Sequence, residues 1–291
     1  MTMTMARSPL FYVNGRMVEA EKACVPVLDP GYLHGDAVFE TMRLYHGIPF
    51  LFERHIDRLQ RSARAAGFRE MAGVKTIKDA VDSVITGNSL KSAMVRMSLS
   101  REMPGSSHHG TFTVTFRDIP AVEGETRGGV HVIYVQDRSL PVPPMAGGVK
   151  SSSYQGNIIA RNMALESGAF EAIIVGQDGF IREGTMSNVF FMKGRRIMTP
   201  STDLGILQGI TRATVMEVGR EFGYAIQEGH YRTGELKNST AAFLTGSGIE
   251  LLRIRLGTDD KGEFEKLKKA WESVRDEKLS AARASIARKQ S

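Results

Sequence analysis

The segment Ser139-Leu-Pro-Val-Pro-Pro-Met-Ala-Gly-Gly148 divides the sequence into two parts with different patterns of apolar residues. Proline lacks an amide hydrogen and glycine is conformationally free, so neither a helix nor a central strand suits this composition. We interpret 137–148 as an interdomain loop, with a small N-terminal domain over 1–136 and a larger C-terminal domain over 149–291. The length of 291 residues suits two domains of ordinary size.

The part before this segment predicts strands, then helices, then strands. In Phe11–Val18, apolar residues flank Asn14-Gly15, a dipeptide typical of a tight hairpin turn. Apolar residues at helical spacing predict two helices, and runs rich in β-branched and aromatic residues predict further strands. The helices are expected over 51–66 and 74–86, and the strands over 37–45, 93–100, 111–116 and 130–136.

The part after the segment predicts helices and strands in alternation, so we expect an α/β (α+β) protein. A helix over 211–222 is expected to begin with Thr211 as its N-cap residue. Phe264, Leu267, Trp271 and Val274 recur at helical spacing, which predicts a C-terminal helix with one docked face. A further helix is expected over 157–168, and strands over 171–175, 188–193 and 241–244.

Composition narrows the class of protein. The net charge is +6, and residues 261–291 hold nine Lys or Arg against five Asp or Glu, which we interpret as a solvated basic helix face. Nucleic-acid binders cluster Lys and Arg with stacking aromatics, and the aromatics here lie at helix-core spacing, so we expect no nucleic-acid partner. Cys24 is the only cysteine, which suits a reducing cytoplasm. No apolar run approaches the ~18 residues of a membrane span, so we expect no membrane partner.

Lys150 is the first candidate for chemistry. It lies in Gly147-Gly-Val-Lys-Ser-Ser-Ser-Tyr154, where small neighbours leave room for a cofactor against its amine. The same surroundings are typical of an exposed loop lysine, because lysine is rarely buried without a partner. From these residues alone, both interpretations stay open.

Four further features point to an anionic, ring-shaped ligand. Gly209-Ile-Thr-Arg212 opens a helix, whose amides and dipole can bind an anion. Thr245-Gly-Ser-Gly248 follows a strand and offers hydroxyls and amides to a phosphate. Glu183 lies between strands, where a carboxylate can keep a pyridine nitrogen protonated. His55 and Arg58 share a helix face, and arginine binds phosphate through a planar fork. Each feature is also compatible with an ordinary cap, turn or surface charge.

Together, in this order and spacing, the chain resembles the class IV aminotransferases, the fold-type IV group of pyridoxal phosphate enzymes. The group includes branched-chain aminotransferases, D-amino acid aminotransferases and aminodeoxychorismate lyases. The stretches that carry the resemblance span almost the whole chain: His34-Gly-Asp-Ala-Val-Phe-Glu-Thr41, His55-Ile-Asp-Arg-Leu59, Lys150 with Tyr154 and Asn157, Glu183-Gly-Thr-Met-Ser-Asn-Val-Phe190, Leu207-Gln-Gly-Ile-Thr-Arg212, and Phe243-Leu-Thr-Gly-Ser-Gly-Ile-Glu250.

The resemblance implies a small N-terminal α/β domain, a larger β-barrel-like C-terminal α/β domain, and pyridoxal 5′-phosphate as cofactor. Lys150 would be the catalytic residue, carrying the cofactor as an internal aldimine, and Glu183 would hold the pyridinium nitrogen. The homodimer common in this family is also implied, with amino acids and 2-oxo acids as small-molecule partners. The remaining implied contacts are Arg58, Ile210, Thr211 and Ser247 to the phosphate, Tyr154 near the phenolic oxygen, and Phe39, Arg96 and Gly248 to the substrate.

The substrate depends on residues that vary within the family. D-amino acid enzymes carry tyrosine before the first-motif glutamate and an Arg-x-His loop, whereas this chain has Phe39 and Ser106-Ser-His108. Phenylalanine at this position is usual in branched-chain enzymes, whose Tyr-x-Arg element corresponds to Met94-Val-Arg96, which keeps the arginine and lacks the tyrosine. The lyases often carry Thr-Thr where this chain has Glu40-Thr41. We favour an L-amino acid aminotransferase of branched-chain type with 2-oxoglutarate as acceptor. The alternatives are a lyase that releases pyruvate from aminodeoxychorismate, and a D-amino acid or (R)-amine aminotransferase.

Overall fold

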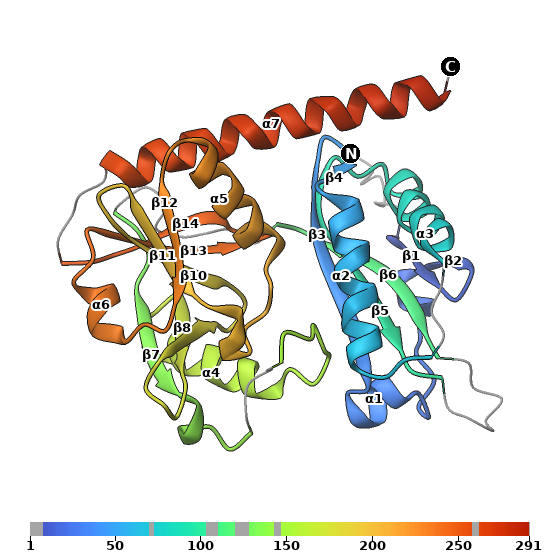
Figure 1. Ribbon diagram of the computed structural model, residues 1–291. Coiled ribbons are helices and arrows are strands. Elements are labelled where there is room, and N and C mark those ends of the chain that lie inside the picture. The colour runs from blue at the N-terminus through green and yellow to red at the C-terminus, as the bar shows by residue number, and fades with distance from the viewer. Residues whose placement is uncertain are drawn as a thin grey trace, which may run out of the picture. The chain divides into compact units, whose positions relative to one another are not determined.

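The computed structural model describes residues 8–69, 73–102, 110–119, 128–142, 147–257 and 262–290 (Figure 1). Its internal contacts group the chain into two compact units. The first contains Met1–Ile119 and Val149–Ser153, and the second contains Pro120–Gly148 and Tyr154–Ser291. Part of the predicted interdomain loop, 143–146, lies outside the described residues. The sequence-based division into domains at 137–148 stays a prediction.

The first unit contains a six-stranded antiparallel sheet in the order β2-β1-β6-β5-β3-β4. Asn14 and Gly15 both have positive φ, as a two-residue hairpin turn requires, and they join the first two strands as predicted. The strands are β1 (Leu10–Val13), β2 (Arg16–Glu19), β3 (Ala37–Tyr45), β4 (Ile48–Pro49), β5 (Ser92–Ser100) and β6 (Phe112–Arg117). The helices are a 3-10 turn η1 (Ala20–Lys22), α1 (Pro30–His34), α2 (Phe52–Ala65) and α3 (Val74–Gly87).

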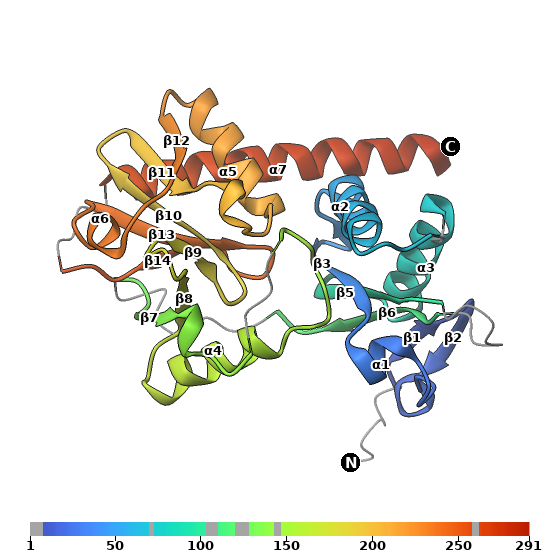
Figure 2. The same ribbon diagram turned by 60° about the horizontal axis from the view of Figure 1, so that its bottom comes forward.

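Helices α2 and α3 pack on one face of this sheet (Figure 2). Alternate residues of β3, such as Val38, Met42 and Leu44, enter the core that these helices cover. The intervening residues, including Phe39 and Thr41, therefore point to the opposite face. Successive residues of β3 therefore lie on opposite faces of the sheet, one face covered by α2 and α3 and the other not.

The second unit contains two sheets, in the orders β12-β11-β10-β13-β14 and β7-β8-β9. An isolated bridge between Val130 and Ile254 connects them, but the described strands form no closed barrel. The strands are β7 (Val132–Gln136), β8 (Glu171–Val175), β9 (Ile181–Gly184), β10 (Asn188–Lys193), β11 (Arg196–Pro200), β12 (Ala225–Gly229), β13 (Ala241–Gly246) and β14 (Glu250–Ile254). The helices are η2 (Asp137–Ser139), α4 (Gln155–Glu166), η3 (Thr202–Leu204), α5 (Ile210–Glu221), α6 (Thr233–Lys237) and α7 (Gly262–Gln290).

The mixed α/β class is confirmed, with one correction at a helix start. Helix α5 begins at Ile210 with Gly209 as its N-cap residue, so the prediction that Thr211 caps it is wrong. The C-terminal helix is confirmed as α7, with Phe264, Leu267 and Trp271 buried on its docked face.

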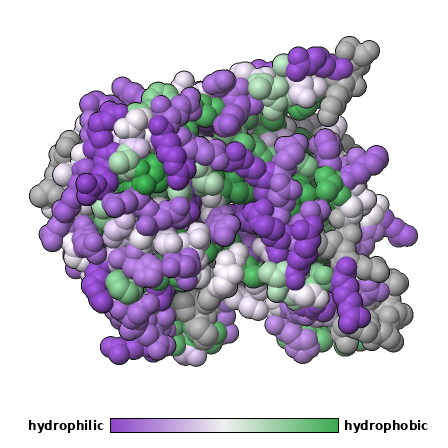
Figure 3. Space-filling model, in the orientation of Figure 1, coloured by the Kyte–Doolittle hydropathy of each residue, from purple (hydrophilic) through white to green (hydrophobic). Residues whose placement is uncertain are grey.

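Hydrophilic residues lie mostly at the surface, and large apolar residues fill the cores. Figure 3 shows hydrophilic residues over most of one face, with apolar residues scattered among them. Within the described residues, no helix combines the length and the apolar character that crossing a membrane requires.

Candidate active site

Lys150 is held by the backbone of the first unit. Short strand β4 pairs with β3 only at Leu44 and Tyr45, so the beginning of β3 can accept another partner on that side. The segment around Lys150 pairs there: the Phe39 amide donates to the Lys150 carbonyl (2.9 Å), and the Ser152 amide donates to the Ala37 carbonyl (2.8 Å). The Lys150 amide donates to Ser62 Oγ of α2 (3.2 Å). These bonds fix the backbone of Lys150, unlike that of an unrestrained loop lysine.

The Phe39 ring contacts two cations. Lys150 Nζ lies 4.5 Å from the ring centroid, and the guanidinium carbon of Arg96 lies 3.7 Å from it. Arg96 comes from the neighbouring strand β5, and its Nε donates to Ser98 Oγ (3.0 Å). Cations over an aromatic face are attracted by its quadrupole. The structure therefore brings together three predicted site residues, namely Phe39, Arg96 and Lys150.

Arg58, a predicted phosphate ligand, lies on α2 and is buried. Its guanidinium forms a two-pronged ion pair with Glu40, from Nε to Oε1 (2.6 Å) and from Nη2 to Oε2 (2.8 Å). His55 Nδ1 lies 2.8 Å from the same Oε2. A planar fork facing a carboxylate is the strong geometry for such a pair. The positive charge of Arg58 is thus partly balanced inside the unit.

The pKa values of this cluster follow from burial and charge. Burial alone would raise the pKa of Glu40, but the charge and hydrogen bonds of Arg58, with the hydrogen bond of His55, lower it to about 2. Burial lowers the pKa of His55 and outweighs the opposing hydrogen bond and charge of Glu40. At neutral pH we therefore assign an ionised Glu40–Arg58 pair beside a neutral His55. Sequence reasoning identified Arg58 but missed Glu40 as its partner.

Glu183, in the second unit, is a buried carboxylate at β9. The Leu207 amide donates to both of its oxygens (3.1 Å each), and Asn188 Nδ2 donates to Oε2 (3.0 Å). Asn188 Nδ2 also donates to the Leu207 carbonyl (2.9 Å), so the three groups form one cluster. Glu183 is only 9% exposed, which excludes the alternative that it is a solvated hairpin glutamate.

The start of α5 lies beside this cluster. A Cβ atom at Gly209 would lie 2.0 Å from Asn188 Oδ1, so this close approach requires glycine. As glycine, the N-cap residue has no side chain with which to cap the helix, and Ile210 and Thr211 lie in the first turn. The backbone amides and the dipole at a helix start favour an anion.

The predicted phosphate turn begins next to the same strand. Asn188 of β10 pairs with Thr245 of β13, whose hydroxyl is buried without a hydrogen-bond partner among the described residues. Ser247 and Gly248 follow in the turn between β13 and β14 and are half-buried. The second unit therefore brings Glu183, the start of α5 and this turn to one region, connected through Asn188.

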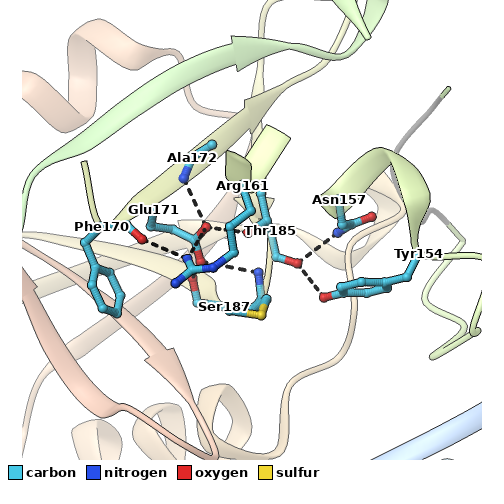
Figure 4. Close-up of polar contacts among 9 residues, drawn as sticks. Tyr154, Asn157, Arg161, Phe170, Glu171, Ala172, Thr185 and Ser187 are labelled. Carbon is cyan, nitrogen blue, oxygen red and sulfur yellow. Dashed lines mark hydrogen bonds and ion pairs between the residues drawn. The ribbon is translucent and has the colours of Figure 1, made fainter. Parts of the chain in front are cut away.

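Tyr154 precedes helix α4. Its hydroxyl donates to the Thr185 carbonyl (2.5 Å), and Asn157 Nδ2 donates to the same oxygen (2.9 Å) (Figure 4). Thr185 follows directly after β9, the strand that carries Glu183. Tyr154 and Glu183 are therefore connected to one short turn of the chain.

The groups present fit pyridoxal phosphate by their chemistry. They include a lysine amine, a buried carboxylate, a helix start without a side-chain cap and an unpartnered threonine hydroxyl. A phosphate, a pyridinium nitrogen and an aldehyde each match one of these groups. Among the described residues, no group of three or more His, Cys, Asp or Glu could hold a metal ion. The predicted loop feature Ser106-Ser-His108 lies outside the described residues.

Comparisons with known proteins agree with this chemistry. Residues 37–256 match the family model described as amino-transferase class IV. The aminodeoxychorismate lyase of Bacillus subtilis is 33% identical, covering 84% of this chain and 85% of the relative. A putative branched-chain-amino-acid aminotransferase of Methanocaldococcus jannaschii is 32% identical, covering 84% and 86%. D-alanine aminotransferases are also among the relatives.

A solved structure gives the same result for the fold. The pyridoxal phosphate-bound form of a hypothetical aminotransferase from Mycobacterium tuberculosis superposes with a TM-score of 0.79. It is 27% identical, and the match covers 91% of this chain and 99% of that one. With a family model that matches most of its length, this chain belongs to the class IV aminotransferases, whose cofactor is pyridoxal phosphate.

Proposed function

We propose that this class IV aminotransferase moves the amino group of an L-amino acid of branched-chain type to a 2-oxo acid such as 2-oxoglutarate, with Lys150 as its reactive amine. The observation that carries this proposal is the Phe39 ring in contact with both the Lys150 amine and the Arg96 guanidinium. A reactive amine, a cation for a carboxylate and an apolar surface for a side chain are the three groups that an apolar amino acid needs.

Pyridoxal phosphate, when bound, supplies an aldehyde that condenses with amines and a ring that withdraws electrons from the bonds at Cα. The amine of Lys150 would hold this aldehyde between turnovers and, once released by the substrate amine, would move the proton at Cα. Because its backbone is bonded to β3 and to Ser62, the amine would act from a fixed origin. Lys150 is therefore proposed as the catalytic residue.

The other proposed cofactor contacts follow from charge. Glu183, buried and oriented by Leu207 and Asn188, would keep the ring nitrogen protonated. Tyr154 would contact the phenolic oxygen. The phosphate would be held by Arg58, Ser247 and the first-turn residues Ile210 and Thr211 of α5.

For the substrate, we propose that Arg96 binds the carboxylate, that Phe39 contacts the apolar side chain, and that Gly248 leaves space for the substrate. Apolar contact favours a branched-chain side chain over an acidic one. The lyase activity is kept as the second candidate because the lyase of Bacillus subtilis is so similar to this chain. A D-amino acid or (R)-amine donor is the third. A homodimer in the cytoplasm stays a prediction.

A panel of donors tests the substrate. The purified holoprotein is mixed, without a 2-oxo acid, with L-leucine, L-isoleucine, L-valine, D-alanine, an (R)-arylamine or aminodeoxychorismate, and the cofactor absorbance is followed. We expect the branched-chain L-amino acids to change the absorbance in a single turnover and 2-oxoglutarate to restore it. Lys150→Ala is the control that must lose this cycle.

Two results would contradict the proposal. Pyruvate released catalytically from aminodeoxychorismate, with no response to L-amino acids, would make the chain a lyase. A response to D-alanine or to the amine alone would assign the third candidate.

A further inference from the structure

Glu171 is a buried carboxylate that the proposed chemistry does not use. It is the first residue of β8 and is 1% exposed. Figure 4 shows it among its polar partners. A buried charge is costly unless hydrogen bonds and an opposite charge compensate it. Its partners therefore indicate why the chain keeps a carboxylate at this position.

Most of these partners belong to one turn of three residues, 185–187. Glu171 Oε1 accepts from Thr185 Oγ1 (2.5 Å), and Oε2 accepts from Ser187 Oγ (3.0 Å) and from the Met186 amide (3.3 Å). The Ala172 amide donates to Oε1 (3.0 Å). Arg161 Nη1 lies 3.5 Å from Oε1 and supplies the opposite charge. Each carboxylate oxygen thus accepts one hydroxyl and one backbone amide.

This turn joins the two strands that carry Glu183 and Asn188. The Gly184 amide donates to the Ser187 carbonyl (2.7 Å), which closes the turn. A Cβ atom at Gly184 would lie 2.2 Å from Ser187 Oγ and 3.0 Å from Glu171 Oε2, so the turn packs against the carboxylate without space for a side chain. The side chain of Met186 is exposed, so apolar burial there does not hold the turn. Hydrogen bonds hold it instead: the Thr185 amide donates to the Ala172 carbonyl (3.1 Å), and Glu171 accepts from both hydroxyls of the turn and from the Met186 amide.

The same turn also holds Tyr154. The Thr185 side chain donates to Glu171, while the Thr185 carbonyl accepts from Tyr154 and Asn157. One residue therefore transmits the position of Glu171 to the tyrosine. On the other side, Ser187 is directly followed by Asn188, which orients the carboxylate of Glu183.

We propose that Glu171 is a positioning residue, which fixes the 185–187 turn and through it the directions of Glu183 and Tyr154. The inference rests on the proposed function, in which these two side chains contact the cofactor. Glu171 itself contacts neither cofactor nor substrate. It acts as the fixed acceptor for a turn whose two ends carry the contacts.

Glu171→Gln tests this role with almost no change of shape. An amide has one acceptor end and one donor end, and each oxygen of Glu171 accepts a backbone N–H that cannot reverse. Either orientation of the glutamine therefore sets two donors against each other and displaces the turn. A displacement of about 1 Å at a reacting group can cost about a hundredfold. We expect the single-turnover rate to fall roughly ten- to a hundredfold and the pH midpoint of the holoenzyme absorbance to move.

A matched control and a double-mutant cycle separate positioning from stability. Ile174 lies in the same strand, but its side chain packs with apolar residues such as Val135 and Leu140 and makes no hydrogen bond to the turn. Ile174→Val should therefore lower the melting temperature without moving the rate or the midpoint. In a background that carries Tyr154→Phe and Glu183→Gln, Glu171→Gln should lower the rate by less than about threefold, because its effect passes through those residues. An equal loss in both backgrounds would overturn the inference.

The remaining outcomes are also decisive. If Glu171→Gln lowers the melting temperature but leaves rate and midpoint as in Ile174→Val, Glu171 is only structural and the proposed function survives. If Tyr154→Phe and Glu183→Gln change neither quantity, the proposed contacts fail, and the inference fails with them. Should Glu171→Gln not fold, Thr185→Val decides: it must move the midpoint while Thr185→Ser restores it, and an unchanged midpoint overturns the inference.

Discussion

Replacing Arg58 with methionine should destabilise the first unit far more than the loss of a surface arginine. Methionine keeps much of the length of the side chain but removes the cation that faces Glu40, which is completely buried. Breaking a buried ion pair by removing one partner typically costs about 3–5 kcal/mol, because it leaves a buried charge without compensation. We expect a loss of this size in the free energy of unfolding at pH 7.

The free energy of unfolding should depend on pH in a direction that follows from the pKa of Glu40. In the wild type, the pKa of Glu40 falls from 4.5 to about 2, so the ionised carboxylate stabilises the fold above pH 4.5 and loses that contribution as the pH falls towards 2. At about 1.4 kcal/mol per pKa unit, the contribution is about 3–4 kcal/mol. In Arg58→Met burial becomes the dominant influence on Glu40 and should raise its pKa above the ordinary value of 4.5, so that the carboxylate takes up a proton as the pH falls. The destabilisation should therefore shrink as the pH is lowered from 8 to 5.

Urea unfolding of the apoprotein, followed by circular dichroism and by hydrogen exchange of β3 peptides, measures this effect. The control is Arg61→Met, an exposed arginine on the same helix, which should change the free energy of unfolding by less than about 0.5 kcal/mol. If Arg58→Met costs no more than Arg61→Met, or costs the same at pH 5 and pH 8, Glu40 does not depend on Arg58 and the reasoning is wrong.

Two further predictions concern ligands. If Arg58 binds the phosphate, Arg58→Met should weaken the binding of pyridoxal phosphate roughly ten- to a hundredfold, because a charge-assisted bond contributes about 1.5–3 kcal/mol, and should barely affect the binding of pyridoxal. Thr211→Ala should cost less binding energy, because the backbone amides of α5 remain. Equal weakening of both cofactor forms, measured as dissociation constants, would refute the phosphate contact. Arg96→Met should raise the KM for L-leucine by roughly tenfold or more while leaving turnover of a carboxylate-free amine unchanged. If steady-state kinetics show an equal loss for both substrates, Arg96 only packs on Phe39.

Local signals predicted the fold where pairing is local. The Asn14-Gly15 turn and the bounds of β3 follow from residue pattern, because two-residue turns and alternating burial are properties of neighbouring residues. Strand β12 was missed because it is largely exposed and pairs in parallel with β11, a strand that precedes α5. Helix α1 was missed although Asp29 and Pro30 formed its signal: Asp29 accepts from two amides of its first turn.

For the site, residue types were predictable and their partners were not. Lys150 and Glu183 follow from motifs, but Glu40 opposite Arg58 depends on the face that β3 turns towards α2, and Asn188 beside Gly209 depends on long-range approach. The same reason explains the error at Thr211: a good N-cap residue lies two positions too late, because Gly209 alone leaves space for Asn188. Capping preference describes the local chain, and tertiary packing overrides it.

The proposed bond between Lys150 and the cofactor can be tested chemically. The purified protein is reduced with borohydride, digested and analysed by peptide mass spectrometry, with Lys150→Ala treated in parallel. We predict a pyridoxyl adduct on the peptide that contains Lys150, and none in the variant. An adduct on a different lysine in the wild type, or an unmodified Lys150 in protein that has lost its yellow colour on reduction, would show that Lys150 does not hold the cofactor.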